Sequence, residues 1–174
     1  MRHHITKLST YGPALGCGIK QFSAVMQSLL LLLVLSATAA VAKPAIINAS
    51  DAYQMATSGE IILVDIRTPQ EWAETGIGEG AIALDMTAKT FVRDLIALRD
   101  AYPDTQIAFI CATGGRSGYV NRYLAKNNFR NTADVPEGMM GSRKGPGWLK
   151  TGLPTYAGNP AEIKKRLQTA LSGN

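Results

Sequence analysis

The sequence predicts an α/β fold in which a central, mainly parallel sheet is flanked by helices. Apolar runs of strand length alternate with helical patterns throughout residues 43–174. The run Ile61–Asp65 lacks the polar–apolar alternation of a half-exposed strand, which indicates a strand buried on both faces, as in a parallel sheet. A glycine-rich turn also joins the apolar run Gln106–Ile110 directly to a helical pattern, as expected of a strand followed by a crossover helix.

Capping residues and apolar spacing predict where the helices begin and end. The expected helices are one capped by Ser50 and ended by Gly59, a short one from Pro69 through Trp72, one capped by Thr87 and ending before Pro103, one capped by Ser117 and running to Lys126, and one capped by Asn159 with Pro160 next and running through Leu171. The third of these is expected to have an apolar face of four residues, namely Phe91, Leu95, Ile96 and Leu98.

Strands are expected between these helices, at residues 61–65, 81–84, 106–110 and 132–135, the last being the final strand. The stretch 138–152 is rich in glycine and is expected to be a loop with one helical turn at Trp148. Residues 43–174 provide enough chain for one domain with a single buried core.

Residues 1–42 have the composition of a secretory signal peptide. The first 28 residues carry three positive charges and no acidic residue, residues 29–35 are almost pure leucine, and an Ala-Val-Ala sequence ends at Ala42. We expect cleavage after Ala42 and export, to the periplasm if the source is a bacterium. The alternative is that the uncharged segment 24–42 is retained as a membrane anchor.

Histidine and cysteine usage excludes several kinds of site. His3, His4 and Cys17 lie in the leader, so cleavage leaves Cys111 as the single thiol and no histidine. That excludes a Cys–His dyad, a Ser–His–Asp triad, a histidine metal site and an intramolecular disulfide, and we expect no metal and no cofactor. Without the leader's three basic residues, 15 Lys and Arg face 13 Asp and Glu, and no basic run indicates nucleic-acid binding.

The stretch 111–117 has the composition of a reactive-cysteine loop. Cys111 ends the strand 106–110, at the edge of the sheet where ligands bind in open α/β folds. Gly114 and Gly115 allow a sharp turn that aims backbone N–H groups inward, and the following helix adds its positive end. Both features favour a thiolate, the nucleophilic form of cysteine. The alternatives are an inert buried cysteine and a nucleotide loop, although the glycine patterns of nucleotide loops are absent from the sequence.

Three motifs resemble those of rhodanese-like domains. Residues 65–72, Asp-Ile-Arg-Thr-Pro-Gln-Glu-Trp, resemble the Asp-x-Arg-x-x-x-Glu-aromatic signature, and residues 111–117 match the Cys-x-x-Gly-x-Arg-Ser active-site loop. Residues 138–154 resemble the C-terminal Gly…Trp…Gly-x-Pro stretch. The resemblance covers residues 50–156 and implies a rhodanese-like three-layer fold. It also implies sulfurtransfer, in which the cysteine carries a sulfane sulfur as a persulfide from a donor to a nucleophilic acceptor.

Each residue of the loop has an expected role. Cys111 is the nucleophile, and the N–H groups of the residues that follow it are expected to hold the thiolate or persulfide anion. Those residues are Ala112, Thr113, Gly114, Gly115, Arg116 and Ser117. Arg116 is expected either to bind an anion or to brace the loop through an ion pair. Ser117 is expected to cap the helix and to donate a hydrogen bond.

Three residues of the first motif are expected to support the loop. Asp65 ends its strand beside the loop and can accept hydrogen bonds from neighbouring N–H groups. Arg67 and Glu71 are four residues apart at the start of a helix, so we expect an ion pair between them.

Two cations in the glycine-rich stretch 139–147, Arg143 and Lys144, are expected to reach the edge of the sheet where Cys111 lies. We expect them to form a rim that attracts an anionic donor or a partner's acidic surface, with Trp148 either at this rim or in the core. The alternative is a solvated pair of cations without a role.

The expected partners are a small sulfur-donor anion and a thiol or cyanide-like acceptor, or a thiol of a partner protein. A membrane is expected only if the leader is retained. Ala112 and Thr113 are neutral where thiosulfate-using members often carry a basic residue, which leaves the donor open. The alternative functions are a binding or regulatory module without turnover, a periplasmic thiol-redox partner, and a cysteine phosphatase, whose Cys-x-x-x-x-x-Arg loop is one residue longer.

Overall fold

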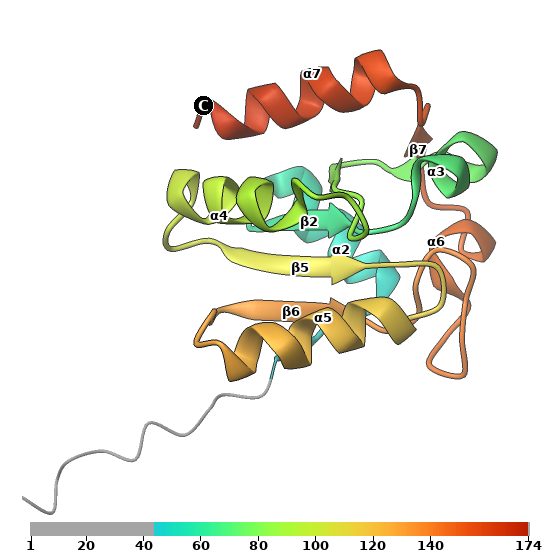
Figure 1. Cartoon of the computed structure of the whole chain (residues 1–174). Helices are drawn as coiled ribbons and strands as arrows, with labels where there is room; N and C mark the ends of the chain where they lie inside the picture. Colours follow the sequence, from blue (N-terminus) through green and yellow to red (C-terminus); the bar gives the residue numbers. More distant parts are fainter. Residues whose placement is uncertain (1–43, 174) are drawn as a thin grey trace, which may run out of the picture. The chain divides into compact units, whose positions relative to one another are not determined.

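The computed structural model describes residues 44–173, which contain a five-stranded parallel sheet with helices on both faces (Figure 1). The strand order is β1-β6-β5-β2-β4, so β5 is central, and every neighbouring pair is parallel. The strands of this sheet are β1 (Ala45–Ile46), β2 (Ile61–Asp65), β4 (Ala81–Ala83), β5 (Gln106–Ile110) and β6 (Thr132–Val135). The predicted α/β fold with a mainly parallel sheet is therefore confirmed.

The helices form layers on either side of this sheet. They are α2 (Ala49–Ser58), α3 (Pro69–Thr75), α4 (Phe91–Ala101), α5 (Gly115–Lys126), α6 (Gly147–Lys150) and α7 (Pro160–Leu171). Helices α4 and α5 cover one face, α2 lies on the other, and α7 packs against α4 and the edge strand β4 (Figure 1). Helices α3 and α6 lie at the carboxyl end of the strands, close to a small antiparallel pair formed by β3 (Ile77–Gly78) and β7 (Thr155–Tyr156).

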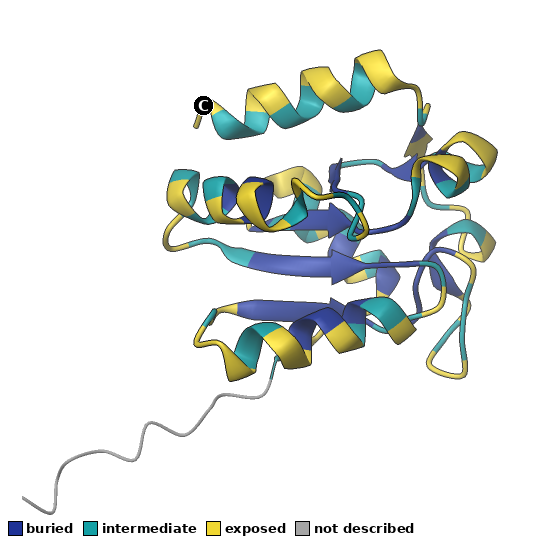
Figure 2. Ribbon diagram, viewed as in Figure 1, coloured by how far each residue is buried: buried dark blue, intermediate teal, exposed yellow. Residues whose placement is uncertain are grey.

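Both faces of the sheet are apolar and covered, which explains why the strand sequences do not alternate between polar and apolar residues. Along β2, Leu63 packs into the core beneath α2 and the next residue, Val64, packs into the core beneath α4 and α5. Figure 2 shows the central strands buried along most of their length. Each large apolar side chain buried in this way contributes roughly 1.5–3 kcal/mol to folding.

The first helix begins earlier than predicted, because the chain offers a better cap. Asn48, not Ser50, is the N-cap of α2, and its Oδ1 accepts a hydrogen bond from the Asp51 N–H at 2.8 Å. The predicted end at Gly59 is confirmed, since this residue adopts a left-handed conformation with φ of 80°.

The cap predicted for the third helix is wrong. Helix α4 begins after Thr90, and Thr87 instead lies in a turn where its N–H donates to Asp85 Oδ1 at 2.8 Å. The expected end of α4 before Pro103 is confirmed. The last helix is capped as predicted, with Asn159 accepting from the Glu162 N–H at 2.9 Å.

The predicted strands at 61–65, 81–84, 106–110 and 132–135 are confirmed to within one residue. Strand β6 is not the last, however, because β7 follows it, and the two-residue strands β1, β3 and β7 were not predicted. A pair of residues is too short to carry a periodic pattern, and pairing with distant strands forms these elements. The helical turn expected at Trp148 is confirmed as α6.

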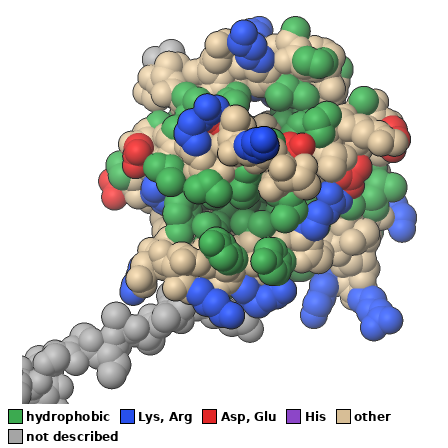
Figure 3. All heavy atoms as spheres, in the orientation of Figure 1, with side chains coloured by type: hydrophobic (Ala, Val, Ile, Leu, Met, Phe, Trp, Pro, Cys, Tyr) green, Lys and Arg blue, Asp and Glu red, His purple; other side chains and the backbone are tan. Residues whose placement is uncertain are grey.

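One face of α4 differs from the prediction. Leu95 and Leu98 are buried as expected, but Ile96 is 49% exposed. Figure 3 shows hydrophobic side chains gathered on the face that α4 and α5 form. The exposed large hydrophobic residues of these two helices are Val92, Ile96, Tyr119 and Tyr123.

The leader predicted for residues 1–42, with its cleavage site and its alternative as an anchor, lies outside the described residues. Among residues 44–173, none of the helices combines the length and the apolar character that crossing a bilayer requires.

Candidate active site

Cys111 follows the central strand β5 and is 1% exposed. The chain turns at Gly114, which adopts a left-handed conformation with φ of 83° and is the N-cap of α5. Helix α5 therefore begins at Gly115, before the chain reaches Ser117. Ser117 is not the cap that the sequence predicts, because the glycine turn already directs the chain into the helix. Ser117 lies instead in the first turn of α5 and is fully buried.

Hydrogen-bond donors surround the Cys111 sulfur. The Gly114 N–H donates to Sγ at 3.2 Å and the Ser117 N–H donates to it at 3.5 Å. The Cys111 thiol in turn donates to the Ser117 Oγ at 3.6 Å. Two backbone dipoles and the positive end of α5 thus point at the sulfur, an arrangement that stabilises negative charge there.

A second loop, residues 136–146 between β6 and α6, braces the cysteine loop through backbone hydrogen bonds. The Met139 N–H donates to the Cys111 carbonyl and the Met140 N–H donates to the Ala112 carbonyl, both at 2.8 Å. Gly138 has φ of 68°, and a Cβ at that position would collide with the Ala112 carbonyl. A Cβ on Gly114 would collide in the same way with the Pro136 carbonyl. The shape of the cysteine loop therefore depends on two glycines in two different loops.

Arg116 pairs with Glu71 through two hydrogen bonds, one of them from Nη1 to Oε2 at 2.8 Å. Glu71 also accepts from the N–H and Oγ1 of Thr68, both at 2.9 Å, which completes a capping box at the start of α3. The hydrogen bond from Arg116 is the main cause that lowers the pKa of Glu71 to about 2. Arg116 thus joins α5 to α3, and of its two expected roles this geometry is the bracing one.

The expected ion pair between Arg67 and Glu71 is wrong. Arg67 turns into the fold instead and binds Asp65, with Nη2 to Oδ2 at 2.7 Å and Nε to Oδ1 at 3.0 Å. It also donates to Thr75 Oγ1 and the Gly76 carbonyl, both at 2.7 Å. The expectation for Asp65 is confirmed, because its Oδ1 accepts from the neighbouring Arg67 N–H at 3.1 Å. Local spacing pointed to Glu71 as the partner of Arg67. The guanidinium binds the buried carboxylate of Asp65 instead.

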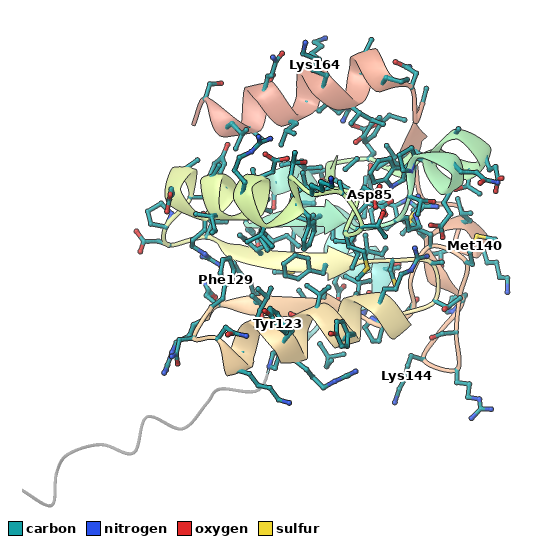
Figure 4. All side chains as sticks on the ribbon, in the orientation of Figure 1. Asp85, Tyr123, Phe129, Met140, Lys144 and Lys164 are labelled. Atoms are coloured by element: carbon teal, nitrogen blue, oxygen red, sulfur yellow. The ribbon has the colours of Figure 1, made fainter. Side chains whose placement is uncertain are left out.

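Arg143 and Lys144 line a groove of about 550 Å³ beside the cysteine loop. Figure 4 shows Lys144 directed outward from the loop after β6. The groove is lined by residues of the cysteine loop and α5, of β1 and β6, and of the second loop, namely Ile46, Thr113, Gly114, Gly115, Gly118, Arg122, Asp134, Pro136, Ser142, Arg143 and Lys144. Both cations thus lie next to the cysteine loop, as the sequence predicted, although Cys111 is not itself among the lining residues.

Trp148 is not at this rim. Its side chain is fully buried in the core beneath α2, where it meets the ring of Tyr53 edge-on at 5.8 Å between ring centroids. The indole N–H donates to the Pro154 carbonyl at 2.8 Å, so its one polar group is satisfied inside the fold. Trp148 therefore belongs to the core, which was the alternative for this residue.

Sequence reasoning missed Asp134. This residue lies on β6 opposite Phe109 of β5, and it faces the same side of the sheet as Cys111, two residues beyond Phe109. It is 7% exposed, and its Oδ1 is buried without a hydrogen-bond partner among the described residues. A signal was present, because an acidic residue stands between the apolar residues Ala133 and Val135 in the predicted strand.

No cluster of three or more His, Cys, Asp or Glu side chains in residues 44–173 could hold a metal ion. Within this part of the chain the chemical features of the site are one thiol, a serine hydroxyl, backbone N–H groups and a buried carboxyl.

The sequence resembles known proteins over most of the described residues. The family model of the rhodanese-like domain matches residues 48–144. An uncharacterised protein of Rickettsia prowazekii (strain Madrid E) is 29% identical over 115 residues, which are 62% of this chain and 94% of the relative. An uncharacterised protein of Rickettsia conorii is 27% identical over the same shares of the two chains.

Two solved structures have a similar fold. The polysulfide-sulfur transferase homodimer of Wolinella succinogenes matches with a TM-score of 0.50 and 21% identity, over 79% of this chain and 91% of that one. The thiosulfate sulfurtransferase of Pseudomonas aeruginosa matches with a TM-score of 0.50 and 18% identity, over 73% of this chain and 24% of that one. At these identities the likeness shows the fold, in agreement with the parallel sheet and its helix layers.

Proposed function

The chain belongs to the rhodanese-like domain family, and from that premise we propose that it is a sulfurtransferase that carries a sulfane sulfur as a persulfide on Cys111. One observation carries the proposal: the sulfur of Cys111 receives N–H hydrogen bonds from Gly114 and Ser117 at the start of α5. Backbone dipoles fixed in this way stabilise a thiolate, the form of cysteine that attacks a sulfur donor.

The proposed reaction has two displacement steps. In the first, the Cys111 thiolate attacks the sulfane sulfur of the donor, a new sulfur–sulfur bond forms, and the rest of the donor leaves with the electron pair of the broken bond. In the second, a nucleophilic acceptor attacks the outer sulfur, and the Cys111 thiolate leaves. Neither step needs an external oxidant or reductant, which suits a site with a single cysteine in the described residues.

We propose a small anionic donor and a thiol or cyanide-like acceptor, which is either a small molecule or a thiol of a partner protein. Glu71 already engages the charge of Arg116. Recognition of an anion therefore falls to the loop's N–H groups and to Arg143 and Lys144 beside them. We further propose that the protein acts after export and that its exported form begins at Lys43, which N-terminal sequencing would test.

A binding module without turnover is the second candidate, and two observations favour it. Cys111 is 1% exposed, and the single cation of its loop is already paired with Glu71. Such a module would keep the fold and the loop, but it would not gain sulfur.

Intact-mass measurement tests the proposal. The full chain is incubated with thiosulfate or with inorganic polysulfide and then freed of excess donor. We expect the mass of one added sulfur atom, which a reducing agent removes, and no such gain in Cys111→Ser. A wild-type chain that gains no sulfur from either donor, while Cys111 still reacts with an alkylating agent, would support the binding module instead.

A further inference from the structure

The groove of about 550 Å³ beside the cysteine loop carries more positive than negative charge. Its charged side chains are Arg122 on α5, Arg143 and Lys144 in the second loop, and Asp134 on β6. We propose that this groove binds the sulfur acceptor, and that the acceptor is a small thiol that carries carboxylate groups. The inference rests on the proposed function, because it names the class of acceptor for the same site.

The three cations of the groove are available to a ligand. Arg122, Arg143 and Lys144 are exposed, and none of them forms an ion pair with the residues that the structure describes. They come from two separate elements, α5 and the second loop, and they line one groove. A carboxylate in the groove therefore meets guanidinium and ammonium groups that no acidic side chain in this part of the chain already pairs.

Among the described residues that line the groove, Asp134 is the only acid, and it opposes the cations. It is 7% exposed and lies beside Gly118, where an added Cβ would be 3.4 Å from Asp134 Oδ2 and 3.3 Å from Arg122 Nη1. The carboxylate is thus close enough to Arg122 to weaken its attraction for an anion. Removing the charge of Asp134 should therefore strengthen the binding of an anion, and removing that of Arg122 should weaken it.

The groove extends to the loop that holds the sulfur. Gly114 and Gly115 line it, and the Gly114 N–H also donates to the Cys111 Sγ at 3.2 Å. Gly114 therefore borders both the groove and the sulfur. The outer sulfur of a persulfide extends about 2 Å beyond Sγ, so a ligand held in the groove by its carboxylates can reach it with its thiol.

Gly115 leaves the surface between the groove and the sulfur open. It is the first residue of α5 and is exposed. It is absent from the glycines with positive φ, and a Cβ there would have no neighbour within 4 Å. Neither the turn nor the packing requires a glycine at this position, although glycine in a helix costs up to about 1 kcal/mol relative to alanine. A ligand that passes close to the backbone accounts for the missing side chain.

The proposed transfer brings two anions together, so positive charge beside the sulfur favours it. The acceptor's thiolate attacks the outer sulfur of the Cys111 persulfide, and a new sulfur–sulfur bond forms. The bond from that sulfur to Sγ breaks, and its electron pair remains on Cys111. The products are the acceptor's persulfide and the Cys111 thiolate, so the total charge is unchanged. The cations of the groove attract the acceptor's carboxylates and raise its concentration next to the persulfide.

Single-turnover transfer from the preformed persulfide of the full chain tests the proposal with two thiols at one fixed pH. Mercaptosuccinate carries two carboxylates and 2-mercaptoethanol carries none. The measured quantity is the ratio of the two rates, in which the reactivity of the persulfide itself cancels. We expect Arg122→Gln to lower this ratio at least about threefold at low salt, the size expected for one exposed ion pair. Asp134→Asn should raise the ratio, and damage to the fold would not move the two variants in opposite directions.

Lys126→Gln is the matched control, because Lys126 is an exposed cation of the same helix that does not line the groove. It should keep the wild-type ratio. The differences should fade as salt rises from about 0.1 M to about 1 M, since the Debye length falls from about 10 Å to about 3 Å. An equal fall in Lys126→Gln would assign the preference to the charge of the whole protein and overturn the proposal. So would a ratio that neither Arg122→Gln nor Asp134→Asn changes.

Gly115→Ala tests the path from the groove to the sulfur. Urea denaturation should show a free energy of unfolding that is retained or raised, because alanine suits a helix better than glycine. Transfer to mercaptosuccinate should nevertheless become slower, because the added methyl group stands in the path of the thiol. A variant that is stable and transfers sulfur to mercaptosuccinate as fast as the wild type would contradict this path.

Binding of succinate, which has two carboxylates and no thiol, separates this proposal from the sulfurtransferase. Succinate added to the full chain should shift the backbone amide NMR signals of Gly115 and Gly118, and Arg122→Gln should weaken its binding. A chain that binds succinate in this way but passes sulfur to neither thiol retains the groove as an anion site and loses the sulfurtransferase. A chain that passes sulfur to both thiols but shows no succinate binding at these glycines retains the sulfurtransferase and loses the groove.

Discussion

Arg67 and Arg116 each hold a carboxylate close to the cysteine loop, but in different surroundings. Arg67 and its partner Asp65 are 1% and 0% exposed, whereas Arg116 and Glu71 are 34% and 29% exposed. Arg67 also donates hydrogen bonds to Thr75 Oγ1 and to the Gly76 carbonyl inside the fold. The buried pair therefore fixes where the chain turns from β2 into α3, and the half-exposed pair joins two helix starts at the edge of the site.

The difference shows that an arginine can stabilise the fold, as Arg67 does, or brace the cysteine loop, as Arg116 does. A buried ion pair is held strongly only because breaking it leaves a charge without water or partner. A pair that solvent reaches contributes less, since water and salt screen it. Substitutions in the two ion pairs should therefore lower the free energy of unfolding by different amounts.

The largest expected effect is on stability, from Arg67→Met. The substitution leaves the Asp65 carboxylate buried without its partner, so we expect the free energy of unfolding to fall by about 3–5 kcal/mol. Urea denaturation of the full chain measures it. Asp65→Asn combined with Arg67→Met should recover part of the loss, because no charge remains buried. A loss under about 1 kcal/mol in the single variant would contradict the contrast between the buried and the half-exposed ion pair.

Glu71→Gln should have a smaller and pH-dependent effect. The pKa of Glu71 is lowered from its ordinary value of 4.5 to about 2, so the carboxylate stabilises the fold fully above pH 4.5, and this contribution is lost as the pH falls toward about 2. We expect the variant to lose about 1 kcal/mol at pH 7 and progressively less at acid pH. Unfolding free energies measured at several pH values would detect this, and a loss that stays constant with pH would argue against the ion pair as its cause.

The smallest effect on stability is expected from the cations of the groove. Arg143 and Lys144 form no ion pair with the described residues, so replacing both with alanine should leave the free energy of unfolding unchanged within about 0.5 kcal/mol. The KM for an anionic donor should rise at low salt and approach the wild-type value at high salt, because the Debye length is only about 10 Å at 0.1 M. An unchanged KM at low salt would remove these cations from donor recognition.

Sequence patterns predicted much of the fold because its main elements are long enough to show a period or an apolar run. The buried run Ile61–Asp65, the strand Gln106–Ile110 and the cap at Asn159 needed only local information. The prediction of an N-cap was wrong where two candidate residues lay close together, as at Asn48 and Ser50. Both residue types suit the position, and the backbone conformation decides which of them caps the helix.

Such local patterns could not predict side-chain partners that lie far apart in the sequence. Arg116 finds Glu71 from 45 residues away, while the local spacing of Glu71 pointed to Arg67. The position of Asp134 beneath α5 follows from strand order, which no local pattern contains. The cysteine loop itself was predictable because its chemistry lies within seven consecutive residues, and its bracing by Gly138 was not.

A single-turnover transfer measures the central claim most directly. Wild-type chain carrying one sulfur on Cys111, freed of donor, is mixed with cyanide, and thiocyanate and the mass of the protein are followed together. The sulfurtransferase account predicts one thiocyanate for each sulfur lost, with Cys111 returning to its free thiol. A persulfide that forms but remains on Cys111 in the presence of both cyanide and a small thiol would contradict it.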